Sequence, residues 1–379
     1  MTDQPPAQRA KTEGNRSAAA LEFRNVSKRY PGGDRPVLVD LSFEVPAGEI
    51  CVLVGPSGCG KTTAMRMVNR MIDITEGDIL LDGASVRKRD PAELRRHIGY
   101  VIQQIGLFPH LSIGDNIATV PRLLGWDKNR VEARVVELLE LISLPAETRE
   151  RYPSEVSGGQ RQRVGVARAL AADPPLMLMD EPFGAIDPIT RERLQNEFLR
   201  LQKDIRKTIV FVTHDIDEAI KMGDRIAILR EGGHLVQFDT PERILAEPAD
   251  DFVARFVGLD RGLKRLSLSS LSDLSLEAAE TVKDGTPVAA RSDPNRVVFV
   301  DDQGRPVGRL GADGPEPVGA VGDPNTSLRD ALSLIMSDAN RALVVVDADG
   351  AVAGLARIEV IAGALAIGNG DGPTEKGGP

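Results

Sequence analysis

The sequence of 379 residues contains only two cysteines, Cys51 and Cys59. Two thiols cannot form a disulfide framework or a cysteine-rich metal cluster, so the fold must rely on hydrophobic cores. Basic residues are also in deficit, because the formal net charge is −9. An acidic chain without an excess of Lys and Arg argues against nucleic acid as a partner.

Long apolar runs are absent as well. No stretch approaches the about 20 consecutive apolar residues that a membrane-spanning helix needs. Residues 1–20 are polar and alanine-rich and lack the apolar segment of a signal peptide. We therefore expect a chain that does not itself cross a membrane and stays in the cytosol. Residues 1–20 and the Gly- and Pro-rich residues 368–379 are predicted to be disordered tails.

The most informative stretch follows a nearly continuous apolar segment, Glu49 to Val54, and precedes a helical apolar pattern. It reads Gly55-Pro56-Ser57-Gly58-Cys59-Gly60-Lys61-Thr62. A strand, a glycine-rich loop and a helix in this order match the P-loop pattern. The sequence therefore predicts a nucleotide-phosphate site at the N-terminus of the helix.

Each residue type in this loop has a chemical role. The glycines allow the backbone to curl and to turn its N–H groups toward phosphate oxygens. Lys61 supplies a positive charge for the β- and γ-phosphates, Thr62 a hydroxyl for Mg²⁺, and Thr63 a donor toward the α-phosphate. We expect the bound ligand to be a nucleotide with Mg²⁺.

Further polar residues stand at the C-terminal ends of two predicted buried strands. Asp180 and Glu181 follow the apolar segment Leu176 to Met179, and His214 follows the strand Thr208 to Thr213. Open parallel sheets bind ligands at this edge. Asp180 is placed to hold the Mg²⁺ shell, Glu181 to deprotonate the attacking water, and His214 to bond both Glu181 and the γ-phosphate.

Two residues have open interpretations at this stage. Gln103 ends a predicted strand and either contacts Mg²⁺ and the attacking water or is a solvated loop amide. Tyr30 follows a strand and either stacks on an adenine base or packs beside a turn.

A second glycine-rich element is Val156-Ser157-Gly158-Gly159-Gln160. Ser157 is a suitable N-cap for the helical pattern that follows, which carries Val164 and Ala167 on one face. The N-terminus of such a helix is either an anion site or a capped helix start without a ligand. The sequence alone does not decide between them.

Taken together, these motifs resemble the ATP-binding subunit of ABC transporters over Leu21 to Gly258. The P-loop, Gln103 as the Q-loop glutamine, the signature Val156–Gln160, Asp180 with Glu181, and His214 occur in the family's order. Two departures are mild: Val156 replaces the usual Leu, and the D-loop reads Gly184-Ala185-Ile186-Asp187 in place of Ser-Ala-Leu-Asp. The resemblance implies an α/β fold with a RecA-like core, an antiparallel β subdomain and a helical subdomain.

The resemblance also implies roles that the residues alone leave open. It assigns adenine stacking to Tyr30 and includes Asp187 in the nucleotide site. It places the signature residues Ser157, Gly158, Gly159 and Gln160 across a homodimer from the P-loop, with two ATP molecules between the subunits. ATP binding would close the dimer and hydrolysis would reopen it, and the groove near Gln103 would transmit this motion to a separate integral membrane permease. An extracytoplasmic substrate-binding protein or domain would deliver the solute to that permease. The subunit would then lie at the cytoplasmic face of the membrane.

The branch that imports glycine betaine, proline, carnitine or choline is a closer match. Residues Val101 to His110 resemble that branch's Q-loop, and Met67–Arg70 and Glu181–Gly184 also suit it. One alternative is an importer ATPase for another small solute. Another is a soluble ABC protein that acts on ribosomes or DNA, although such proteins generally carry two cassettes, and here one P-loop and one signature occur.

The remaining chain predicts a second domain. We expect a linker at 259–275 and a small α+β domain at 276–367, which contains an internal repeat. Residues Val298–Gly308 align with Val344–Gly354, each an apolar strand, an Asp/Gly turn and a second strand. The repeat resembles a pair of CBS modules, but Arg357 and Val360 stand where that family has its ribose-binding Thr and Asp. Nucleotide sensing and a structural or dimerising role both stay open.

Overall fold

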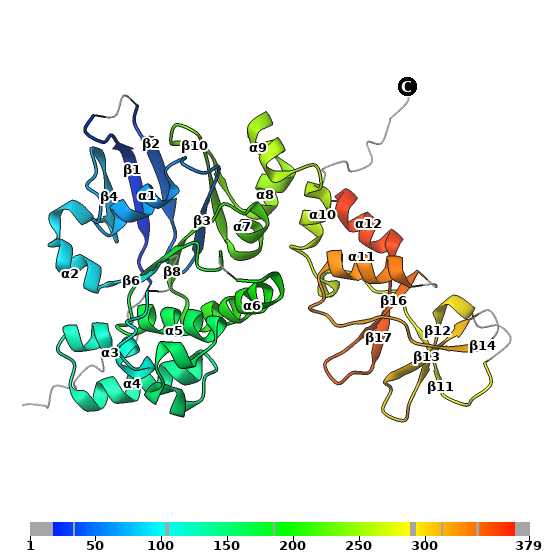
Figure 1. Cartoon of the computed structure of the whole chain (residues 1–379). Helices are drawn as coiled ribbons and strands as arrows, with labels where there is room; N and C mark the ends of the chain where they lie inside the picture. Colours follow the sequence, from blue (N-terminus) through cyan, green and yellow to red (C-terminus); the bar gives the residue numbers. More distant parts are fainter. Residues whose placement is uncertain are drawn as a thin grey trace, which may run out of the picture. The chain divides into compact units, whose positions relative to one another are not determined.

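The computed structural model describes residues 18–32, 35–102, 106–184, 186–288, 293–311, 314–338 and 341–367. The chain divides into two compact units, one up to Pro241 and the other from Glu242 onward (Figure 1). This division comes earlier in the chain than Gly258, where the sequence predicts the first domain to end. The domain boundaries themselves stay predictions.

A six-stranded sheet forms the centre of the first unit, in the order β10-β9-β3-β8-β7-β6. Its strands are β3 (Ile50–Val54), β6 (Ile98–Val101), β7 (Leu176–Asp180), β8 (Thr208–Val212), β9 (Arg225–Arg230) and β10 (His234–Asp239). All neighbours pair in parallel except β10, which is an antiparallel edge strand. Every residue of β3, β7 and β8 is buried, which explains their continuous apolar sequences. Since β3, β8 and β7 are adjacent, their C-terminal ends meet at one edge.

Strands from the first part of the chain form a smaller antiparallel sheet, in the order β2-β1-β4-β5. Its strands are β1 (Leu21–Lys28), β2 (Leu38–Val45), β4 (Glu76–Leu81) and β5 (Ala84–Ser85). Phe23 and Phe43 stack across β1 and β2 with ring centroids 4.5 Å apart. Both rings share one core with Leu53 of β3 and Met65 of α1 (Lys61–Val68). The antiparallel sheet therefore packs onto the element that carries the P-loop.

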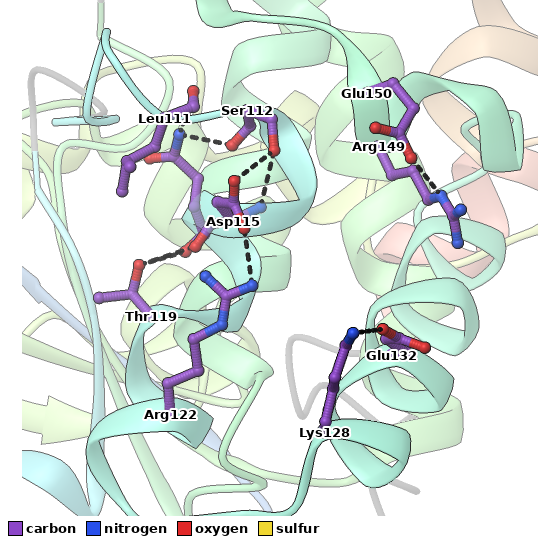
Figure 2. Close-up of polar contacts among 10 residues, drawn as sticks. Leu111, Ser112, Asp115, Thr119, Arg122, Lys128, Glu132, Arg149 and Glu150 are labelled. Carbon is purple, nitrogen blue, oxygen red and sulfur yellow. Dashed lines mark hydrogen bonds and ion pairs between the residues drawn. The ribbon is translucent and has the colours of Figure 1, made fainter.

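Helices dominate the middle of the first unit. They are α2 (Pro91–Arg96), α3 (Ile113–Leu123), α4 (Lys128–Leu141) and α5 (Gly158–Leu170). Figure 2 shows how α3 is anchored: the Ser112 hydroxyl accepts from the Asp115 N–H, and Asp115 pairs with Arg122 at 2.7 Å. Pro121 lies inside α3, although proline ordinarily interrupts a helix. It stands in the last turn of the helix. Because proline has no backbone N–H, the loss of hydrogen bonds is confined to this end of α3.

Two further helices of the first unit follow β7 and β8 in the chain, namely α6 (Pro188–Ile205) and α7 (Ile216–Met222). Helix α8 (Pro241–Ala246) lies at the division between the units. Short 3₁₀ turns occur at Val86–Lys88, Ala146–Glu150, Pro153–Glu155, Leu271–Asp273 and Pro294–Arg296. No helix in the described part of the chain is both long and apolar enough to cross a bilayer.

The second unit contains two small sheets and several helices. One sheet has the order β11-β12-β13-β14 and the other β15-β16-β17. The strands are β11 (Glu280–Lys283), β12 (Val297–Val300), β13 (Pro306–Gly311), β14 (Gly314–Pro317), β15 (Val321–Gly322), β16 (Ala342–Val346) and β17 (Val352–Arg357). The helices are α9 (Asp251–Val257), α10 (Arg261–Leu266), α11 (Leu328–Ser337) and α12 (Ile358–Ile367).

The internal repeat forms two equivalent arrangements in this unit. In the first, β11 pairs in parallel with β12, which forms an antiparallel hairpin with β13. In the second, β15 pairs in parallel with β16, which forms a hairpin with β17. Phe299 opposes Gly308 in one hairpin, and Val345 opposes Gly354 in the other. The strand-turn-strand prediction is confirmed for both copies.

The segment from Asp260 to Leu274, which the sequence predicts to be a linker, contains α10 and a 3₁₀ turn. Leu266 and Leu271 are buried and share a hydrophobic cluster with Ile335 and Leu343. The segment therefore contributes to the core of the second unit. Leu274 of the same segment is partly buried against this cluster, and the Ser-rich composition gives no local sign of the contribution.

Candidate functional site

The P-loop lies between β3 and α1, as the sequence predicts. Gly58 and Gly60 have φ angles of 81° and 99°, in the region that favours glycine. A Cβ on Gly60 would approach Leu38 Cδ2 to 2.6 Å, whereas a Cβ on Gly58 would meet nothing within 4 Å. The loop is thus packed tightly against β2 on one side and open at Gly58. This geometry fits a backbone cradle for phosphate.

Lys61 lies inside this loop and is 7% exposed. Its Nζ donates to the carbonyls of Gly55 and Pro56 at 2.7 and 2.9 Å, and it lies 3.8 Å from Cys59 Sγ. Burial raises the pKa of the Cys59 thiol, which keeps it protonated beside the cation. The loop therefore holds one positive charge close to the phosphate cradle.

Thr62 connects the loop to the end of β7. Its Oγ1 donates to Asp180 Oδ1 at 3.1 Å, and Arg66 Nη2 lies 3.9 Å from Asp180 Oδ2. Burial raises the pKa of Asp180, while the bond from Thr62 and the charge of Arg66 oppose this shift. A hydroxyl and a carboxylate oxygen side by side are the hard ligands that Mg²⁺ prefers. The residues present therefore fit Mg²⁺, although the described residues hold no cluster of three acidic, His or Cys side chains for a metal.

Glu181 and His214 form a pair at the same edge. His214 Nδ1 lies 3.0 Å from Glu181 Oε1. Because an ionised carboxylate only accepts, Nδ1 is the ring nitrogen that carries the proton. Glu181 has a φ of 44°, which few side-chain-bearing residues adopt, and its N–H donates to the Val212 carbonyl of β8. The backbone is thus held in an unusual conformation that directs the Glu181 side chain toward His214.

The signature and D-loop residues lie at the starts of α5 and α6. Ser157 and Gln160 form a capping box, in which each side chain accepts from the other residue's backbone N–H. Asp187 caps α6 by accepting from the Thr190 N–H at 3.0 Å, and this bond lowers the pKa of Asp187. A Cβ on Gly159 would lie 3.6 Å from Thr190 Cγ2 and 3.9 Å from Leu194 Cδ1 of α6, so the two helix starts approach each other here. The polar groups of the signature therefore bond within their own helix start and not to the P-loop of the same chain.

One connection escaped the sequence analysis. Gln162 of α5 is buried, and its Nε2 donates to the carbonyl of Pro182, next to Glu181. The signature helix is thereby tied directly to the catalytic edge of the sheet. A glutamine two residues after Gln160 in a charged helix gives no local sign of this long-range contact.

Two predicted site residues are not tested by this geometry. Tyr30 is 39% exposed, and Lys28 Nζ lies 4.9 Å from its ring centroid. The ring is thus available for stacking, and the adenine role stays a prediction. Gln103 lies outside the described residues.

Comparisons with known proteins agree with this arrangement. Residues 38–184 match the family model described as "ABC transporter". The chain is 44% identical to the osmoprotectant import ATP-binding protein OsmV of Salmonella typhimurium, over 92% of this chain and 97% of the relative. The chain belongs to the ABC transporter family. It is 52% identical to the choline transport ATP-binding protein OpuBA of Bacillus subtilis, over 72% of this chain and 70% of that relative.

The fold is also that of solved ABC cassettes. A structure described as the dimeric post-hydrolysis state of the ATP-binding cassette MJ0796, bound to ADP and Pi, superposes with a TM-score of 0.52 at 32% identity. The match covers 58% of this chain and 98% of that one. The predicted ABC ATPase fold is therefore confirmed, and the chain is an ABC-type ATPase that binds ATP.

Proposed function

We propose that this chain is the ATP-hydrolysing subunit of an importer for osmoprotectant quaternary amines such as glycine betaine, carnitine or choline. The observation that carries the proposal is the edge formed by β3, β8 and β7. It unites the buried Lys61, the Thr62–Asp180 oxygen pair and the Glu181–His214 pair in one site. The names of the relatives that match over most of the chain support the substrate class.

The chain's own residues account for the hydrolysis step. The P-loop amides and Lys61 bind the phosphates, and Thr62 with Asp180 would hold Mg²⁺, which neutralises charge on the β- and γ-phosphates. Glu181 accepts a proton from the attacking water at its carboxylate. His214 holds that carboxylate through Nδ1 and keeps Nε2 available for the γ-phosphate.

The site requires a second copy of the chain. The capping box uses the backbone N–H groups of Ser157 and Gln160, which leaves those of Gly158 and Gly159 at the first turn of α5 for an anion. Among the described residues, the side chains of Ser157 and Gln160 bond within that turn, and we propose that the turn faces ATP held by the P-loop of a partner. A homodimer with two ATP molecules between its subunits is therefore part of the proposal, and the similar solved cassette, described as dimeric and bound to ADP and Pi, supports it.

A groove next to the Q-loop is the proposed contact for the membrane permease. Its volume is about 330 Å³, and its walls include Met71, Tyr100, Phe108, Thr119 and Arg168. Met71 and Phe108 are 52% and 42% exposed, and because both line this groove a partner that docks here would cover apolar surface. The bonds that anchor α3 in Figure 2 hold Thr119 at this groove. Docking of a permease here would hold the chain at the cytoplasmic face of the membrane, with a substrate-binding protein or domain on the other side.

The proposal is tested by deleting the gene in its own cells and measuring uptake of radiolabelled glycine betaine and choline at high osmolarity. The wild-type gene is expected to restore uptake, whereas Glu181→Gln is expected to restore none, because hydrolysis falls by about 10²–10⁴-fold without the base. Glu147→Gln, at an exposed position in a 3₁₀ turn, is the matched control and should restore uptake fully. Unchanged uptake of both amines in the deletion strain would contradict the substrate class.

A further inference from the structure

A buried carboxylate is hydrogen-bonded to the residue that precedes His214. Glu218 of α7 is 9% exposed, and its Oε1 accepts from Gln195 Nε2 of α6 at 3.0 Å. The Thr213 side chain also hydrogen-bonds this carboxylate. Gln195 and Thr213 are themselves buried. Polar groups from the end of β8, from α6 and from α7 therefore satisfy one another inside the core.

Arg191 extends this cluster along α6. It stands one turn before Gln195, and its charge acts favourably on the Glu218 carboxylate. Arg191 Nη2 donates to the carbonyl of Ile186 at 3.1 Å. Its Nε is buried without a hydrogen-bond partner among the described residues. The first turns of α6 thus hold a cation between the Glu218 carboxylate and the Ile186 carbonyl.

Both ends of the cluster adjoin residues of the nucleotide site. Thr213 directly precedes His214, which contacts Glu181, and Ile186 directly precedes Asp187, which caps α6. We propose that Glu218 is a positioning residue for hydrolysis, which fixes the strand end that carries His214 against α6 and thereby against the Ile186–Asp187 segment. This inference rests on the ATP hydrolysis in the proposed function.

Stability does not explain a carboxylate at this position. A buried charge is costly unless it is paired, and an apolar side chain of similar size is often neutral or stabilising in such a site. A carboxylate instead accepts directional bonds from two separate elements at once, which an apolar side chain cannot do. The cluster therefore fixes the orientation of α6 relative to the end of β8. A displacement of α6 is transmitted to this strand end through the Glu218 side chain.

The test is Glu218→Gln in the full-length chain, with steady-state ATP hydrolysis as the readout. Glutamine keeps the volume but removes one acceptor oxygen and the charge that faces Arg191. We expect kcat to fall by about 10- to 100-fold, the cost of a misplaced catalytic group, while the KM for ATP stays unchanged. Asp217→Asn removes a charge from the neighbouring exposed position of α7 and should leave kcat unchanged.

An exchange variant separates positioning from simple loss of stability. Glu218→Gln combined with Gln195→Glu rebuilds the bond in the opposite direction and keeps a carboxylate within reach of Arg191. We expect it to recover most of the lost kcat. A wild-type rate in Glu218→Gln, or an exchange variant no faster than Glu218→Gln, would overturn the inference. A wild-type chain that does not hydrolyse ATP would instead contradict the proposed function.

Discussion

At the scale of single residues, the site depends on charges that are held partly out of water. Asp180 lies at the buried end of β7, and its pKa is raised because burial disfavours the ionised form. Lys61 is a buried cation whose nearest acceptors are two backbone carbonyls. The Lys61 charge would be stabilised by a bound phosphate, and the Asp180 charge by a bound metal ion. Neither of these partners is present in the nucleotide-free protein. The site is therefore expected to gain stability from its ligand.

Replacement of Asp180 by Asn tests this electrostatic cost. A carboxyl whose folded pKa lies above its unfolded value, about 3.9 for Asp, binds protons more tightly in the folded state. Its cost is absent below the unfolded pKa and fully present above the raised folded pKa. We expect nucleotide-free Asp180→Asn to have a higher Tm than the wild type at pH 7, with the difference shrinking as the pH falls toward 4. A lower Tm at pH 7, measured by calorimetry, would show that the bond from Thr62 and the charge of Arg66 outweigh burial.

At the scale of elements, the second unit is held together by a buried arginine. Arg309 of β13 is 2% exposed, and burial lowers its pKa. Its Nη1 donates to the Ala342 carbonyl at the start of β16, and its Nη2 to the Asn295 carbonyl. Arg357 of β17 donates to the same Asn295 carbonyl and pairs with Glu277 at 2.6 Å. Arginines from both hairpins thus converge on one carbonyl, which supports a structural role for these residues and leaves nucleotide sensing as the open alternative.

Arg309→Ala is expected to loosen this junction. The buried Ala342 carbonyl would lose a charged donor, at a cost of about 1–3 kcal/mol, whereas the Asn295 carbonyl keeps its bond from Arg357. Hydrogen exchange measured by mass spectrometry should become faster in 341–357 and stay unchanged in Ile50–Val54, which lies in the other unit. Arg341→Ala removes an exposed charge near the same strand and serves as the control. Unchanged protection of 341–357 in Arg309→Ala would contradict the structural role.

The elements also show what a sequence can predict. The P-loop, Asp180, Glu181 and His214 were predicted because each follows a buried strand whose apolar run is visible locally. The two hairpins of the second unit were predicted from their repeated strand-turn-strand pattern. Gln162, Glu218 and Arg309 were not, because each acts through a partner that is remote in the chain, and helix α10 was missed because its apolar residues are few.

At the scale of the whole molecule, the chain combines an ABC cassette with a smaller repeat-containing unit. The relative that aligns over 92% of the chain extends the similarity across both units. We propose that the sheet edge provides half of each nucleotide site and that the signature of a partner subunit completes it. We therefore propose an assembly in which ATP hydrolysed by this chain drives the import of a quaternary amine through a separate permease.

The most direct measurement reconstitutes this chain with its permease and substrate-binding partner in proteoliposomes that contain ATP and Mg²⁺. Glycine betaine uptake and ATP hydrolysis are then followed together. The account predicts that uptake requires ATP, that the amine stimulates hydrolysis, and that both rates collapse in Glu181→Gln. Hydrolysis that continues at the wild-type rate in Glu181→Gln, or that the quaternary amines leave unstimulated and uncoupled from uptake, would contradict it.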